Sequence, residues 1–164
     1  GDDEPFFVHL PDDLIWAETG CLSQLNERYQ STGCSVVAVE EIPLEKSSSY
    51  GVAAVDDQHR ISAIVEKPAP AKAPSNLGVV GRYLFTPAIF AKLATTGEGS
   101  GGEIQLTDAI AALLEDESVY AQPFTGQRYD CGSKLGYVKA NLDFALERDE
   151  LAAPLREHLR AMQR

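Results

Sequence analysis

Short apolar runs alternate with amphipathic segments at the start of the chain. Residues 6–10 and 35–42 are rich in aromatic and β-branched side chains, which favours buried strands. Between them, residues 21–31 carry apolar side chains at helical spacing, and Gly33 follows where a C-terminal helix cap belongs. A strand, a helix and a strand of these lengths predict a βαβ unit, so we expect this part of the sheet to be parallel.

Two further apolar runs enclose the central stretch of the chain. Residues 61–65 lead into Glu66, Lys67 and Pro68, and a linker rich in alanine and proline separates them from the run 77–85. Because Pro68 cannot donate to a sheet, the strand should stop near Lys67. Ligands of open α/β sheets bind at the carboxyl ends of strands. Glu66 can there accept sugar hydroxyls and Lys67 can hold a phosphate, although a solvated surface pair is the alternative.

The segment before this stretch contains a loop and a predicted hairpin. The polar loop 47–51 ends in Gly51, whose backbone a ligand can approach closely, although a simple turn explains it equally well. Residues 52–55 and 61–65 predict two strands joined by a turn at 56–59.

The last third of the chain is predominantly helical in pattern. Residues 89–93 and 106–114 predict two helices, with Thr107 as the N-cap of the second. Residues 119–124 and 127–131 predict a β-hairpin. The pattern then indicates a helix capped by Ser133 and a final amphipathic helix. The first of these should bury one face, formed by Leu135, Val138, Leu142 and Leu146.

Carboxylates follow the first and the last predicted strands. Asp12 and Asp13 follow residues 6–10 after Pro11, and Asp130 lies at the end of the segment 127–131. Magnesium prefers one or two carboxylates together with substrate phosphates, so acids at strand ends are candidate ligands. Polar turns or helix caps are the alternative for each of them.

Composition narrows the class of protein. The chain has 164 residues, 44% hydrophobic and 24% charged, which is typical of a single globular domain. The net charge of −11 argues against general nucleic-acid or anionic-membrane binding. The 3 cysteines show no CxxC spacing, which favours reduced thiols and a cytoplasmic protein.

Several runs become specific when they are taken together, because they follow one another in a fixed order. They are Leu10-Pro11-Asp12-Asp13, Tyr50-Gly51-Val52, Val65-Glu66-Lys67-Pro68, Ser75-Asn76-Leu77, Val80-Gly81-Arg82-Tyr83, Glu103-Ile104-Gln105-Leu106-Thr107-Asp108 and Asp130-Cys131-Gly132-Ser133-Lys134-Leu135-Gly136-Tyr137. This order closely resembles the bacterial UTP–glucose-1-phosphate uridylyltransferases, also called UDP-glucose pyrophosphorylases. The last two runs are more particular to that family than the others, and the resemblance covers essentially the whole chain.

The resemblance implies a fold class. It implies an α/β, Rossmann-like nucleotide-diphospho-sugar transferase fold with a mixed, mainly parallel sheet flanked by helices and incomplete at the N-terminus. Residues 1–150 would form the sugar-binding and metal-binding part of the nucleotidyltransferase domain. Residues 151–164 would form a C-terminal helix.

The resemblance also implies a metal site. Asp12 and Asp130 correspond to the pair that holds a catalytic Mg²⁺, and Asp13 is a weaker candidate because the family position falls on the first acid of the pair. Arg82 and Lys134 lie in matching runs, and we assign them supporting electrostatics alone.

The sugar side follows from the same resemblance. Glu66 corresponds to the acceptor for glucose hydroxyls, and the backbone groups of Gly51 and Val79 correspond to further sugar contacts. Lys67 corresponds to the catalytic, phosphate-binding cation. The implied substrates are UTP and glucose 1-phosphate, which give UDP-glucose and pyrophosphate.

One departure from the family bears on activity. The glycine-rich, arginine-containing loop that opens the family, and the lysine that holds the triphosphate, do not occur in this sequence. We therefore expect a carboxyl-terminal half that is inactive alone. Missing strands would leave the edge of the strand 35–42 bare, so we also expect a homo-oligomer. The alternatives are another sugar-1-phosphate nucleotidyltransferase, such as a thymidylyltransferase, or a non-catalytic, truncated binding or assembly module.

Overall fold

The computed structural model describes residues 3–99 and 102–162. Its strands are β1 (Phe6–His9), β2 (Asp13–Trp16), β3 (Ser35–Glu41), β4 (Gly51–Val55), β5 (Ile61–Glu66), β6 (Leu77–Phe85), β7 (Val119–Pro123) and β8 (Gln127–Asp130). Its helices are α1 (Cys21–Thr32), α2 (Ala88–Thr95), α3 (Leu106–Leu113), α4 (Lys134–Leu146) and α5 (Asp149–Met162), with short 3-10 segments η1 (Leu44–Ser49) and η2 (Pro70–Lys72).

The long strand β6 organises the main sheet. The order is β5-β4-β6-β3-β7, and β1 also pairs with β6. Along one edge β6 is antiparallel to β3. Along the other edge it is antiparallel to β4 at Leu77 and Gly78, and to β1 from Arg82 to Phe85. Strands β3 and β7 are parallel. The expected mixed α/β fold is confirmed, but among the described strands β3–β7 is the parallel pair and the remaining pairs are antiparallel.

The predicted βαβ unit needs a correction. Strands β1 and β3 run in the same direction, as the intervening helix requires, but β6 lies between them and is antiparallel to both. They are therefore not neighbours. The predicted bare edge at residues 35–42 is also wrong, because β3 has β6 on one side and β7 on the other.

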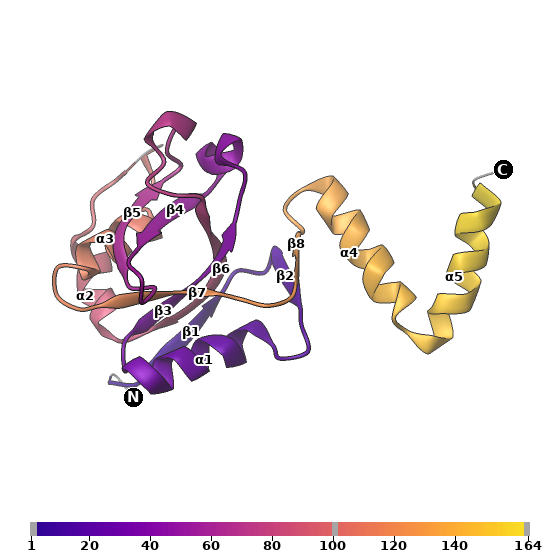
Figure 1. The fold of residues 1–164 in the computed structure, drawn as a ribbon, viewed down its shortest axis with the longest axis horizontal. Coiled ribbons are helices and arrows are strands. Elements are labelled where there is room, and N and C mark those ends of the chain that lie inside the picture. Colours follow the sequence, from indigo (N-terminus) through magenta and orange to yellow (C-terminus); the bar gives the residue numbers. More distant parts are fainter. Residues whose placement is uncertain (1–2, 100–101, 163–164) are drawn as a thin grey trace.

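Helices cover both faces of the main sheet, as Figure 1 shows. Alternate residues of β3 explain this arrangement: Val36 and Ala38 pack toward Leu25 of α1, whereas Val37 and Val39 pack into the cluster that contains Ile110 of α3. Because successive side chains of a strand point to opposite faces, the continuous apolar run of β3 is buried on both sides. The fold thus has three layers, with the sheet between two layers of helices. The ends of the strands are not covered by these helices and can contribute residues to a site.

The predicted hairpin at residues 119–131 is wrong. Strand β7 stays in the main sheet beside β3, whereas β8 leaves it and pairs antiparallel with β2 in a separate two-stranded sheet. Gly126 permits the change of direction with a φ of 138°. Strand β2, which the sequence pattern did not predict, begins at Asp13. This pairing places Asp13 opposite Asp130.

Two predicted helix ends are confirmed, but one predicted helix face is not. Gly33 adopts a left-handed φ of 67°, and the Ser133 side chain caps α4 by accepting from Gly136 N. Leu135 and Val138, however, are 65% and 60% exposed, and Leu142 and Leu146 are half-buried, so the predicted apolar face of α4 is covered only toward its C-terminal end. Its opposite side packs instead, with Ala140 buried. Helices α4 and α5 stand away from the main sheet beyond β8 (Figure 1).

The state of the cysteines and the length of the helices relate to the surroundings in which the protein folds. Cys21, Cys34 and Cys131 are free thiols, and burial raises the pKa of the Cys21 thiol to about 11. Within the described ranges, no helix has the length and apolar character that crossing a bilayer requires.

Candidate active site

A cavity of about 410 Å³ opens at one end of the main sheet. Most of the residues that the sequence singled out line it: Asp12, Gly51, Glu66, Val79 and Asp130. They come from the turn after β1, from β4, β5 and β6, and from the end of β8. Segments more than a hundred residues apart in the chain therefore meet at one surface.

Asp12 and Asp130 point toward the same place. Asp130 Oδ1 lies 3.2 Å and Asp12 Oδ2 lies 3.3 Å from the point that a Cβ on Gly132 would occupy, so the two oxygens are within about 6.5 Å of each other. Their backbones are tied as well, because Cys131 N donates to Asp12 O at 2.7 Å. Both side chains belong to exposed residues and can meet a ligand.

Asp13 has a different role from its neighbour. It is buried, and its Oδ1 accepts from Arg128 Nε while its Oδ2 accepts from Gly81 N at 2.7 Å. A Cβ on Gly81 would come within 2.7 Å of Asp13 Oδ2 and of Leu10 Cβ, so this approach requires glycine. Both oxygens of Asp13 are thus used in contacts that hold the strands together. The weaker prediction that Asp13 is a metal ligand has no geometric support.

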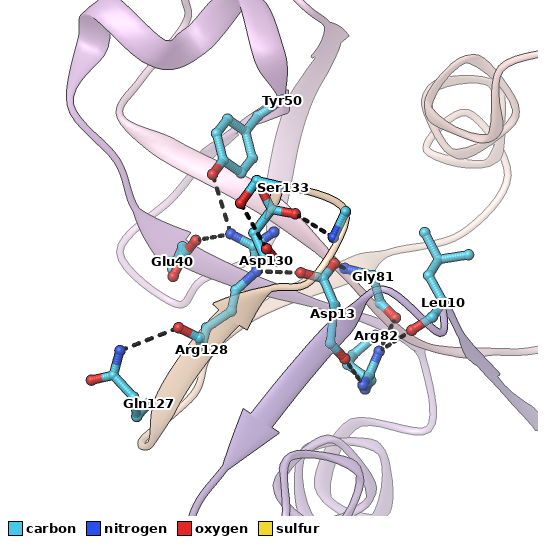
Figure 2. A network of polar contacts seen from close by, with 11 residues as sticks. Leu10, Asp13, Glu40, Tyr50, Gly81, Arg82, Gln127, Arg128, Asp130 and Ser133 are labelled. Carbon is cyan, nitrogen blue, oxygen red and sulfur yellow. Dashed lines mark hydrogen bonds and ion pairs between the residues drawn. The ribbon is translucent and has the colours of Figure 1, made fainter. Parts of the chain in front are cut away.

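Arg128, which the sequence analysis missed, lies at the centre of this network. Figure 2 shows its guanidinium between Asp13, Glu40 and Tyr50: Nη1 lies 2.5 Å from Glu40 Oε1 and donates to Tyr50 Oη at 3.2 Å. Burial opposes its charge, but hydrogen bonds to Asp13 and Tyr50 keep the pKa of the guanidinium above its usual range. Arg128 stands two residues before Asp130, and in a strand that spacing puts both side chains on one face.

Glu66 is the last residue of β5, as the following proline predicted. Its Oε2 accepts from Thr107 Oγ1 at 2.6 Å, and its Oε1 lies 3.4 Å from Lys67 Nζ. Lys67 has a left-handed φ of 44° and a side chain that is 55% exposed. Lys67 does not line the cavity itself, but it stands at its rim through Glu66.

Thr107 was predicted as a helix cap, and that prediction is wrong. The N-cap of α3 is Gln105, and Thr107 lies one residue inside the helix with its hydroxyl directed to Glu66. Local sequence cannot distinguish these uses, because the partner carboxylate is 41 positions away.

Tyr83 is a further lining residue that the sequence analysis did not assign. Burial raises the pKa of its hydroxyl, and the negative charges of Asp13 and Glu66 raise it further. The Tyr83 hydroxyl therefore stays protonated near neutral pH, within range of the negative charges of Asp13 and Glu66.

The two expected supporting cations lie outside the cavity lining. Arg82 is buried and donates to the carbonyls of Leu10 and Gly81, each at 2.8 Å, and to that of Asp13. It thereby holds the turn that carries Asp12. Lys134 is an exposed residue at the start of α4.

The donor set limits the kind of metal that the cavity can hold. Among the described residues, no group of three or more His, Cys, Asp or Glu side chains comes together as a metal site. Asp12 and Asp130 supply two carboxylates without nitrogen or sulfur. This set suits Mg²⁺, which usually keeps water and substrate oxygens as its other ligands.

Comparisons with known proteins show the family of this chain. The nucleotidyl transferase family matches residues 1–147. The chain is 43% identical, over 98% of its length and 57% of the relative, to a UTP–glucose-1-phosphate uridylyltransferase 2 of Staphylococcus saprophyticus. It thus spans little more than half the length of the curated relatives that it matches.

Solved structures give the same result. A UDP-glucose pyrophosphorylase complexed with UDP-glucose has a TM-score of 0.84 and 42% identity, covering 90% of this chain and 58% of that one. A UTP-bound UGPase from Acinetobacter baumannii has a TM-score of 0.83 and 38% identity, covering 96% of this chain and 56% of that one. The expected resemblance is confirmed, and the chain belongs to the nucleotidyl transferase family.

Proposed function

We propose that the intact protein is a UTP–glucose-1-phosphate uridylyltransferase and that this chain carries its sugar and metal side. The observation that carries the proposal is the convergence of Asp12, Asp130, Glu66, Gly51 and Val79 on one cavity. The relatives are named for this reaction, and two of the similar structures are described as complexes with UDP-glucose and with UTP.

The sugar would bind against Glu66. A carboxylate offers about four acceptor sites, and those of Glu66 that Thr107 and Lys67 leave open can accept glucose hydroxyls. Gly51 lines the cavity beside this carboxylate, so its backbone groups are candidates for further sugar contacts. Lys67 at the rim would hold the phosphate of the sugar as a point charge.

Asp12 and Asp130 would hold Mg²⁺, and their exposed, converging oxygens fit that ion. When bound, the ion supplies positive charge against the phosphates of the substrates. The chain's own contribution is to keep the two carboxylates in place through the β2–β8 pairing and through Arg82.

In the proposed reaction, an oxygen of glucose 1-phosphate forms a bond to the α-phosphorus of UTP. The bond from that phosphorus to the bridging oxygen breaks, and pyrophosphate leaves. The nucleophile is already an anion, so no side chain has to remove a proton. Glu66 and Lys67 would serve by holding the sugar phosphate in line, which is the dominant contribution in phosphoryl-type transfer.

A direct assay tests the proposal. We expect the intact protein to release pyrophosphate from UTP and glucose 1-phosphate with Mg²⁺, and to form UDP-glucose. Parallel reactions with dTTP and with other sugar 1-phosphates cover the thymidylyltransferase alternative. A clear preference for dTTP, or no nucleotidyl transfer with any sugar phosphate, would contradict the proposal.

We propose further that the protein acts in the cytoplasm as a homo-oligomer, without nucleic-acid or membrane partners. Free, unpaired thiols support the location. The exposed apolar side chains of α4, among them Leu135, Tyr137 and Val138, support an association between copies. The net charge of −11 disfavours polyanionic partners.

A further inference from the structure

The hydroxyl of Thr107 donates its hydrogen bond to the carboxylate of Glu66. Thr107 is buried in the first turn of α3, and its Oγ1 donates to Glu66 Oε2 at 2.6 Å. It makes no cap for its own helix. A bond of this length to an ionised acceptor belongs to the charge-assisted class, which is about twice as strong as a bond between neutral groups.

Gly51 lies close against the contact between Thr107 and Glu66. A Cβ on Gly51 would lie 3.2 Å from Thr107 Oγ1 and 3.3 Å from Glu66 Oε2, so even one methyl group would press on the pair. Lys67 Nζ approaches the other oxygen, Oε1, at 3.4 Å, but that side chain is 55% exposed and free to move. Thr107 is therefore the rigid partner of the carboxylate, and Lys67 is the mobile one.

A glutamate at a strand end has three rotatable bonds and needs a fixed partner to present its lone pairs in one direction. We propose that Thr107 is a positioning residue that sets the orientation of Glu66 and thereby decides which sugar hydroxyls this carboxylate accepts. The inference rests on the proposed function, in which Glu66 receives the sugar. It assigns α3 a part in sugar selection, although no residue of α3 was expected to contribute.

Thr107→Val is the informative variant, because it keeps the shape of the side chain and removes the hydroxyl. In the intact protein, we expect the KM for glucose 1-phosphate to rise about tenfold, since a hydrogen bond that orders a charged acceptor is lost. The KM for UTP should stay within about twofold. Thr107→Ser keeps the hydroxyl and should restore the KM to within about threefold of the wild type.

Two further measurements separate positioning from a general structural effect. The preference for glucose 1-phosphate over its galactose epimer should fall in Thr107→Val and recover in Thr107→Ser. In a Glu66→Gln background, Thr107→Val should add little to the sugar KM, because its target is already altered. Thr96→Val is the matched control: Thr96 Oγ1 donates to Lys92 O at the end of α2, away from the cavity.

Crystal structures of the wild type and of Thr107→Val provide a readout that needs no turnover. We expect one Glu66 rotamer in the wild type and a different or divided one in the variant. Thr107→Ala serves the same purpose if the valine variant does not fold. An unchanged rotamer, an unchanged sugar KM, or equal increases in both KM values would overturn the inference. Absence of nucleotidyl transfer in the wild type would instead overturn the proposed function, and the rotamer comparison would still decide the role of Thr107.

Discussion

The carboxylates that line the cavity differ in their hydrogen-bond and ion-pair partners. Both oxygens of Asp13 are occupied by Arg128 and by the backbone of Gly81, so this side chain joins strands. Glu66 has one rigid and one mobile partner and keeps acceptor capacity toward the cavity. Asp12 and Asp130 are exposed and converge, and Asp130 Oδ1 accepts from Gly132 N at 3.1 Å. Residue type alone describes all of these side chains as acidic groups. Their contacts separate them into a structural carboxylate, a candidate sugar acceptor and a candidate metal pair.

Glu66→Gln tests the sugar contact, because it keeps the shape and removes the charge. Hydrogen bonds to charged groups contribute about 1.5–3 kcal/mol, so we expect the KM for glucose 1-phosphate to rise about tenfold or more. The KM for UTP should change little. Steady-state kinetics on the intact protein provides the measurement, with Glu115→Gln on an exposed, distant surface as the control. Equal losses for both substrates in a folded variant would contradict a sugar-specific role.

Asp12→Asn and Asp130→Asn test the metal proposal. Each replaces a charged oxygen ligand by an amide, which binds Mg²⁺ more weakly. We expect kcat to fall by about a hundredfold or more, since charge stabilisation is the main contribution in this chemistry, while the KM for the sugar changes little. Higher Mg²⁺ concentrations should recover part of the rate. Asp57→Asn, in the exposed turn before β5, is the control. Wild-type rates in either site variant would end the proposal.

At the level of elements, the small β2–β8 sheet is the part that completes the cavity. It brings Asp130 beside Asp12 across more than a hundred residues, and it contributes Arg128. Arg128 then joins this sheet to β3 through Glu40 and to the end of η1 through Tyr50. An element of four residues on each side is too small to be stable alone, so these charged contacts and the packing of α4 must hold it in place.

Arg128→Met tests this connection. It leaves the Asp13 and Glu40 carboxylates partly buried without their cation, and removal of one partner from a buried pair typically costs about 3–5 kcal/mol. We expect the free energy of unfolding to fall by about 3 kcal/mol in denaturant titrations. Arg60→Met is the matched control, because its ion pair with Asp56 is exposed to solvent and should contribute little to stability. Similar losses in both variants would contradict the role of Arg128.

At the level of the whole molecule, charge and coverage determine what the chain can do alone. Its net charge is −11, and the cations nearest the cavity, Arg128 and Lys67, already face carboxylates. The chain also spans 57% of its relative in Staphylococcus saprophyticus. The glycine-rich segment 97–102 lacks the GxxxxGK[ST] pattern of a phosphate-binding loop.

We therefore expect the chain by itself to release no pyrophosphate from UTP and glucose 1-phosphate, because catalysis here depends on holding two phosphates in one geometry. Calorimetry should nevertheless detect glucose 1-phosphate binding in the presence of Mg²⁺, which would show that the sugar side is folded. The intact protein in the same assay is the positive control. Turnover by the chain within a few-fold of that control would show that the nucleotide site lies within these residues.

Local chemistry in the sequence was sufficient for several features. Pro68 ends β5 at Glu66, Gly33 ends α1 in a left-handed conformation, and Ser133 caps α4, because each acts within a few residues of itself. Periodic apolar positions likewise predicted most strands and helices. The order of short motifs indicated the family, which the comparisons confirm.

Only the tertiary structure decided which segments become neighbours. It placed β6 between β1 and β3, paired β8 with β2 instead of β7, and turned the Thr107 hydroxyl to Glu66. It also left Leu135 and Val138 of α4 exposed, on a face that periodicity predicted to be buried. The physical reason is that an apolar pattern specifies which side of an element avoids water but not which partner covers it. Pairing depends on contacts between residues far apart in the chain, for which no local signal exists.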